Sequence, residues 1–86
     1  MTEQEFESRM AQAETMCGLS KRRGYYEGYM RGLRRFYHGP RFGTLQEHEE
    51  WLSLSYERDE TRAHRGRGYQ DGLQGVRPHT FPPAWP

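Results

Sequence analysis

Arginine and tyrosine gather in two stretches of this chain, and side chains of these types can bind a polyanion. The first stretch runs from Arg23 to Leu33, and a shorter echo runs from Arg67 to Gly75. Guanidinium groups hold phosphates and tyrosine rings stack on unpaired bases, so the composition is typical of proteins that bind single-stranded RNA. An alternative is that the arginines form an ordinary solvated face or neutralise acidic helices. The candidate nucleic-acid-binding residues are Arg22, Arg23, Tyr26, Arg31, Arg34, Arg35, Tyr37 and Arg67.

Glycine recurs at every fourth position in both stretches, first at Gly24, Gly28 and Gly32 and then at Gly68 and Gly72. On a helix this spacing lines one stripe with bare backbone. Each interior glycine costs about 0.5 to 1 kcal/mol relative to alanine, so we expect a contact too close for any side chain. A close helix crossing is the favoured interpretation, and a ribose-phosphate backbone is the alternative. The two copies would cross each other through Gly28 and Gly72, or the glycine faces would close a homodimer.

Acidic residues occupy the segment between the two stretches, and they define a second possible interface. A small inhibitor of the phage kind, such as an anti-CRISPR, would place such residues in a cationic groove that is meant for nucleic acid. Its partner would be a protein complex that handles nucleic acid. The alternative is a solvated or salt-bridging helix face. These residues are Glu47, Glu49, Glu50, Glu57 and Glu60.

No constellation in the sequence indicates catalysis. Cys17, His38, His48, His64 and His79 lie far apart without the spacing of zinc ligands, and neither a Walker loop nor a Gly-x-Ser-x-Gly motif occurs. His48 falls on the apolar side of its helix, which favours a hydrogen-bonded interfacial histidine over a general base. We therefore expect a protein that is not an enzyme and that uses no cofactor or metal.

A chain of 86 residues supports one small domain, and at 33% hydrophobic residues its core must rely on aromatic side chains. The single cysteine, the acidic N-terminus and the absence of a long apolar run predict a cytoplasmic protein without a membrane partner. We expect a helical domain over residues 1–76 and a Pro-rich tail over residues 77–86.

Helical periodicity predicts an all-α fold, a small bundle of three or four short helices with helix-turn-helix hairpins and an extended C-terminal tail. The first helix should cover residues 3–17, after a capping box at Thr2 and before Gly18. A second helix should be capped by Ser20 and should end at His38.

The third helix follows a capping box at Thr44, and its apolar side runs from Leu45 to Tyr56. Charge and glycine over residues 59–66 predict a break or kink before the second stretch.

The tyrosines divide between the core and the surface. Tyr25, Tyr29 and Leu33 follow helical spacing and should be buried, whereas Tyr26 and Tyr37 are the better candidates for exposed stacking rings.

The order of several motifs resembles a known family. An Arg-Gly-Tyr-x-x-Gly helix, a basic pair, a turn with proline and an aromatic, and a helix with tryptophan and a following aromatic occur as Arg23–Gly28, Arg34-Arg35, Pro40 with Phe42, and Trp51-Leu52 with Tyr56-Glu57. The segment from Arg23 to Glu57 thus resembles ribosome modulation factor, and Ala63 to Gly75 resembles its opening again. The resemblance implies a non-enzymatic factor that binds the small ribosomal subunit or its RNA and sterically blocks the message path.

Overall fold

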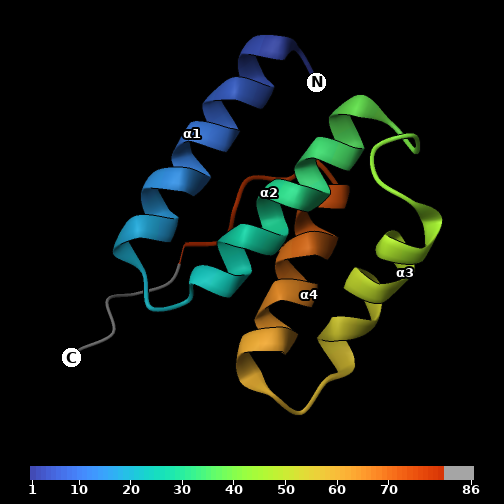
Figure 1. The fold of residues 1–86 in the computed structure, drawn as a ribbon. Coiled ribbons are helices and arrows are strands. Elements are labelled where there is room, and N and C mark those ends of the chain that lie inside the picture. Colours follow the sequence, from blue (N-terminus) through green and yellow to red (C-terminus); the bar gives the residue numbers. More distant parts are fainter. Residues whose placement is uncertain (81–86) are drawn as a thin grey trace.

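Helices make up most of the computed structural model, which describes residues 1–80 (Figure 1). The elements are α1 (Glu3–Leu19), α2 (Arg23–His38), α3 (Leu45–Ser53), the 3-10 turn η1 (Leu54–Tyr56) and α4 (Glu60–Leu73). No strand occurs within residues 1–80, which confirms the predicted all-helical class for that part of the chain. Residues 81–86 of the predicted Pro-rich tail lie outside the described residues.

Side-chain caps fix three of the four helix starts. Thr2 and Thr44 each accept a hydrogen bond from the N–H three residues on, both at 3.1 Å, as the capping boxes predict. Asp59 caps α4 in the same way by accepting from the Arg62 N–H at 3.0 Å. The predicted break is therefore present, but it ends at Asp59, and Gly66 lies inside α4.

Ser20 does not cap α2, contrary to the prediction. α1 continues through Gly18 to Leu19, and the Ser20 N–H donates to the Met16 carbonyl at 2.8 Å, which closes the last turn of α1. Arg22 instead occupies the N-cap of α2 without a side-chain capping hydrogen bond, and its N–H donates to the Ser20 hydroxyl at 3.0 Å.

The central feature of the fold is the close pairing of α2 with α4, which lie side by side and run in the same direction (Figure 1). A Cβ atom placed on Gly28 would lie within 3.0 Å of the Arg65 backbone, and one on Gly68 within 3.0 Å of the Tyr25 backbone. The predicted crossing of the two copies is confirmed. Because the glycine faces are covered by this crossing, they are not available to close a homodimer.

The register of the crossing differs from the predicted one by one helical turn. A Cβ on Gly32 would meet the Tyr69 backbone, and a Cβ on Gly72 would meet the Tyr29 backbone. The equivalent positions are thus Gly28 with Gly68 and Gly32 with Gly72, not Gly28 with Gly72. The structural repeat is Gly-Tyr-x-x-Gly-Leu, which occurs at residues 28–33 and 68–73. Gly24 lies near the N-terminal end of the helix pair, where an added Cβ would be 3.0 Å from the Thr61 carbonyl oxygen.

α1 covers a second side of α2 and forms the hydrophobic core with it (Figure 1). Tyr25, Tyr29 and Leu33 are buried as predicted. Tyr26 is also fully buried, so the expectation that it is exposed is wrong. It lies one residue beyond Tyr25 on the helix and packs in the cluster that contains Ala13 of α1.

α3 and η1 pack against the remaining side of α4. His48 Nδ1 lies 2.8 Å from the Tyr69 hydroxyl, so His48 is an interfacial hydrogen-bonding residue as predicted. The apolar side predicted from Leu45 to Tyr56 is only partly buried, and the α-helix ends at Ser53, before Tyr56. Leu45 is 66% exposed and Tyr56 is 87% exposed.

Tyrosine hydroxyls of α2 hold the chain that follows α4. Tyr29 donates to the Val76 carbonyl at 2.7 Å, and Tyr26 donates to the His79 carbonyl at 2.9 Å. The Tyr25 hydroxyl accepts from the His79 N–H at 2.9 Å. The hydroxyl of a buried tyrosine needs a hydrogen-bond partner, and this segment supplies one to each of the three tyrosines. Within residues 1–80 no helix combines the length and the apolar character needed to cross a membrane.

Candidate functional site

Arg31 and Arg35, both predicted to bind phosphates, hold the fold together instead. Arg31 forms an ion pair with Glu47 of α3, and its guanidinium lies 5.3 Å from the centre of the Trp51 ring. Arg35 Nη1 donates to the Phe42 carbonyl at 2.8 Å, which fastens the loop after α2. These contacts attach α3 and its loop to α2, and they remove two of the predicted phosphate ligands.

The two predicted stacking tyrosines do not offer open rings. Tyr26 is buried and hydrogen-bonded to His79. Tyr37 is half-buried and stacks on Phe6 of α1, with ring centres 4.3 Å apart and planes 10° apart. An exposed arginine–tyrosine face on α2 is therefore absent. The physical reason is that a chain poor in aliphatic residues uses its aromatic rings as core.

Other predicted cationic residues remain on the surface. Arg22 and Arg23 are exposed where α2 begins, and Arg67 is exposed on α4, whereas Arg34 is half-buried. Burial lowers the pKa of His64, and the nearby charges of Arg22 and Arg67 lower it further, while Glu60 opposes the shift. Arg22, His64 and Arg67 therefore share one region of the surface. We call Lys21, Arg22, Arg23, His64 and Arg67 the basic edge.

Helix direction adds to the positive potential at the basic edge. α2 and α4 are parallel, so both N-termini, with their partial positive charge, lie at the same end of the pair. The first turn of α2 contains no acidic residue, whereas α4 begins with Asp59 at its N-cap and Glu60 in its first turn. The start of α2, where Arg22 and Arg23 are exposed, is therefore the part of this end that attracts anions.

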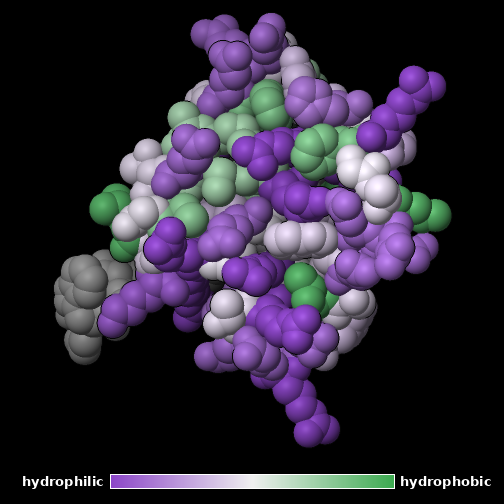
Figure 2. Space-filling view, viewed as in Figure 1, coloured by the Kyte–Doolittle hydropathy of each residue, from purple (hydrophilic) through white to green (hydrophobic). Residues whose placement is uncertain are grey.

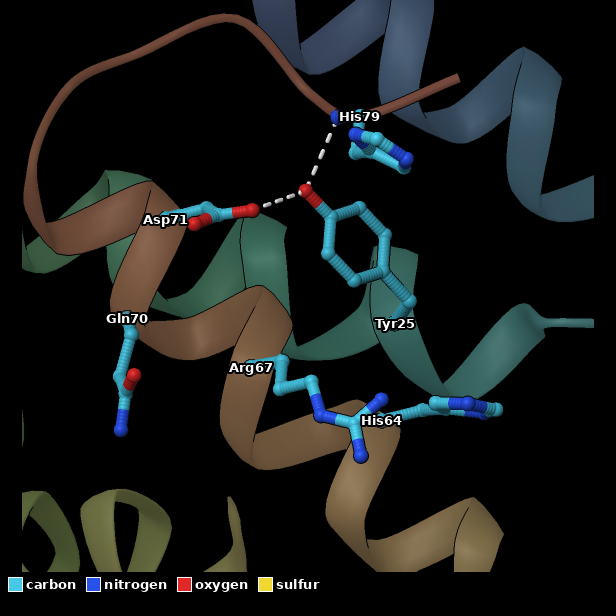
Figure 3. Close-up of a pocket in the computed structure, with 6 residues that line it drawn as sticks. All are labelled: Tyr25, His64, Arg67, Gln70, Asp71 and His79. Carbon is cyan, nitrogen blue, oxygen red and sulfur yellow. Dashed lines mark hydrogen bonds between the residues drawn. The ribbon is translucent and has the colours of Figure 1, made fainter. Parts of the chain in front are cut away.

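A pocket of about 330 Å³ adjoins the basic edge (Figure 3). Its lining residues come from α2, from α4 and from the segment after α4: Tyr25, His64, Arg67, Gln70, Asp71 and His79. Figure 3 shows Asp71 and His79 beside the Tyr25 hydroxyl, with Arg67 and His64 at the other end of the ring. The Gln70 side chain points away and donates to the Ser55 hydroxyl at 3.0 Å.

Sequence reasoning did not select Asp71 or His79 as functional residues. Asp71 follows Arg67 by one helical turn, so the spacing alone predicts that the two residues share one face of α4. The approach of His79 to Tyr25 was not, because it depends on how the segment after α4 turns back across α2.

The acidic residues remain a separate surface feature. Glu47 pairs with Arg31, but the other four make no ion pair within residues 1–80 and are exposed: Glu49, Glu50, Glu57 and Glu60. Figure 2 shows the surrounding face as mainly hydrophilic, with apolar side chains in small areas. No group of three or more metal-ligating side chains comes together among residues 1–80.

Searches with the chain found no matching family model, no matching curated protein and no matching solved structure. Its class is therefore defined by architecture and surface: a small all-helical protein with a parallel glycine-mediated helix pair and a cationic end.

Proposed function

We propose that the chain is a non-enzymatic RNA-binding factor that docks on ribosomal RNA through the basic edge and acts by steric block. The observation that carries the proposal is that Arg22, at the N-cap of α2, and Arg67 of α4 are both exposed and both close enough to His64 for their charges to lower its pKa. Cations from two helices that meet on a surface can contact successive phosphates of one strand.

The order of motifs that resembles ribosome modulation factor supports the small ribosomal subunit as the target. Its Arg-Gly-Tyr-x-x-Gly helix corresponds here to the start of α2, where Arg22 and Arg23 are exposed. The mechanism follows from size and charge alone: a bound domain of 86 residues excludes the message from the surface that it covers.

Charge reversal tests this proposal. The double variant Arg22→Glu/Arg67→Glu should lose binding to small ribosomal subunits, because it places two negative charges at the basic edge. Arg41→Glu is the control for charge reversal away from the basic edge, since Arg41 is an exposed arginine in the loop after the far end of α2. Sedimentation with purified subunits, before and after ribonuclease treatment, measures the effect. Equal loss in both variants, or binding that survives ribonuclease, would contradict the proposal.

A second candidate function rests on the exposed carboxylates that lack ion pairs within residues 1–80, which are Glu49, Glu50, Glu57 and Glu60. A phage-type inhibitor would insert them into the cationic groove of a nucleic-acid-processing complex. In that case Glu49→Lys/Glu50→Lys would abolish partner binding, and Arg22→Glu/Arg67→Glu would leave it intact. The two double variants therefore separate the two functions in one binding assay.

A further inference from the structure

The pocket beside the basic edge combines a carboxylate and a guanidinium on one face of α4. Asp71 and Arg67 are separated by one helical turn, and both line the pocket. A pocket of about 330 Å³ falls at the lower end of the range for small-molecule sites, which is about 300 to 1,000 Å³. A ligand that fits this pair must carry hydrogen-bond donors at one end and negative charge at the other.

The carboxylate of Asp71 is oriented by the protein and keeps acceptor capacity. Its Oδ2 accepts from the Tyr25 hydroxyl at 2.5 Å, and no described residue donates to its Oδ1 (Figure 3). Burial, together with the hydrogen bond to Asp71, raises the pKa of Tyr25, so the phenol stays protonated and keeps donating. A fixed carboxylate with one unused oxygen is an acceptor for N–H groups of a ligand.

Imidazole rings flank the same pocket. The His79 ring centre lies 6.4 Å from that of Tyr25, and His64 lines the end nearest to Arg22. The lowered pKa of His64 favours the neutral ring at this edge of the pocket. Arg67, which is exposed, can reach a phosphate at the mouth.

We propose that this pocket binds one unpaired guanine nucleotide of an RNA strand, with the base at Asp71 and the phosphate at Arg67. The inference rests on the proposed RNA-binding function and adds to it a preference for one base. Guanine presents two adjacent donors, N1–H and the N2 amino group, which match the unused Oδ1 of Asp71 and the second lone pair of Oδ2, whose first accepts from Tyr25. Uracil presents a single N–H between two carbonyl oxygens, which a carboxylate repels. RNA-binding proteins commonly read the Watson–Crick edge of splayed bases in this way.

Isosteric substitution of the carboxylate tests the base preference. Asp71→Asn keeps an oxygen that accepts from Tyr25 but turns an acceptor into a donor. Binding of fluorescent U₆ and of the same hexamer with one central guanosine is measured by anisotropy for the wild-type chain, for Asp71→Asn and for Glu57→Gln. Glu57→Gln is the charge-matched control, because Glu57 is exposed and does not line the pocket. Thermal melts verify that all three are folded.

The wild-type chain and Glu57→Gln should prefer the guanosine-containing hexamer by roughly 10-fold to 100-fold, the discrimination of a good bidentate base contact. Asp71→Asn should lose the preference and still bind U₆. Equal binding of both hexamers by the wild-type chain would overturn the guanine site and leave RNA binding intact. If neither hexamer binds, titration with GMP and UMP decides whether the pocket binds guanine. Shifts of the His64 and His79 imidazole resonances with GMP alone support the pocket, and unchanged resonances reject it.

Discussion

Alanine in place of Gly28 or Gly68 should destabilise the fold strongly, although alanine is the better helix former. A Cβ at either position would lie within 3.0 Å of backbone atoms of the opposing helix, on Arg65 and Tyr25 respectively. A backbone obstacle cannot rotate away as a side chain would, so α2 and α4 must separate. Separation also loosens the α2 tyrosines that hold the segment after α4.

The size of the effect follows from two opposing terms. Overpacking costs about 1 to 3 kcal/mol, and the backbone obstacle places these sites at the upper end. Helix propensity returns about 1 kcal/mol for the change from glycine to alanine. The net loss in the free energy of unfolding is therefore about 2 kcal/mol, which for a domain of this size lowers Tm by roughly 8 to 16 °C.

Gly18 provides the matched control, because it lies in α1 and a Cβ there would meet nothing within 4 Å. Gly18→Ala should raise the free energy of unfolding by up to about 1 kcal/mol. Gly28→Ala combined with Gly68→Ala should cost less than the sum of the two single changes, since the first already separates the helices. Urea unfolding followed by circular dichroism measures all four variants. Stabilisation by Gly28→Ala, or strict additivity of the pair, would refute the parallel crossing.

Two further predictions concern the tyrosines. Tyr26→Phe should lower the free energy of unfolding by about 1 kcal/mol, because the His79 carbonyl loses the hydrogen bond that the Tyr26 hydroxyl donates. Tyr37→Phe should be neutral in the same urea titration, because no hydrogen bond of the Tyr37 hydroxyl occurs within residues 1–80, and an equal loss in both variants would contradict the reasoning. Burial raises the pKa of Tyr29 to about 12 and also raises that of Tyr25. Unfolded phenols lose their protons from about pH 10, so stability should be full below pH 10 and fall as the pH rises through 10 to 12. Melts from pH 8 to 12 that show no alkaline loss would disprove this linkage.

Most of the fold was predictable because its signals are local. The capping residues Thr2 and Thr44, the end of α2 at His38 and the buried stripe from Tyr25 to Leu33 all depend on neighbours within one or two turns. Even the crossing of the two copies followed from the conformational cost of glycine.

The register was not predictable from the same pattern. Glycines spaced by four residues keep nearly the same stripe when one helix slides by a turn, so Gly28 could pair with Gly68 or with Gly72. Aligning the two stretches by residue identity from Arg23 and Arg67 pairs Gly28 with Gly72, which is the wrong register. Packing selects the repeat that also aligns Leu33 with Leu73.

The candidate site was less predictable because it depends on long-range contacts. Arg31 looked like a phosphate ligand until α3 placed Glu47 against it. Tyr26 looked exposed because a single amphipathic face was assumed for α2, whereas α1 and α4 bury two sides of that helix. Arg22 and Arg67 were selected separately, and only the parallel pairing brings them together around His64.

The salt dependence of binding to small ribosomal subunits tests the central claim most directly. Of the six arginines that the sequence alone assigned to nucleic-acid binding, Arg31 and Arg35 are engaged in the fold. Three others lie at the basic edge, where Lys21 joins them, so three or four cations are available there. The logarithm of the binding constant should therefore fall with the logarithm of the KCl concentration at a slope of about −2 to −4. Arg22→Glu/Arg67→Glu should bring the slope closer to zero by about 2. An affinity that stays constant between about 50 and 200 mM KCl would contradict binding through the basic edge.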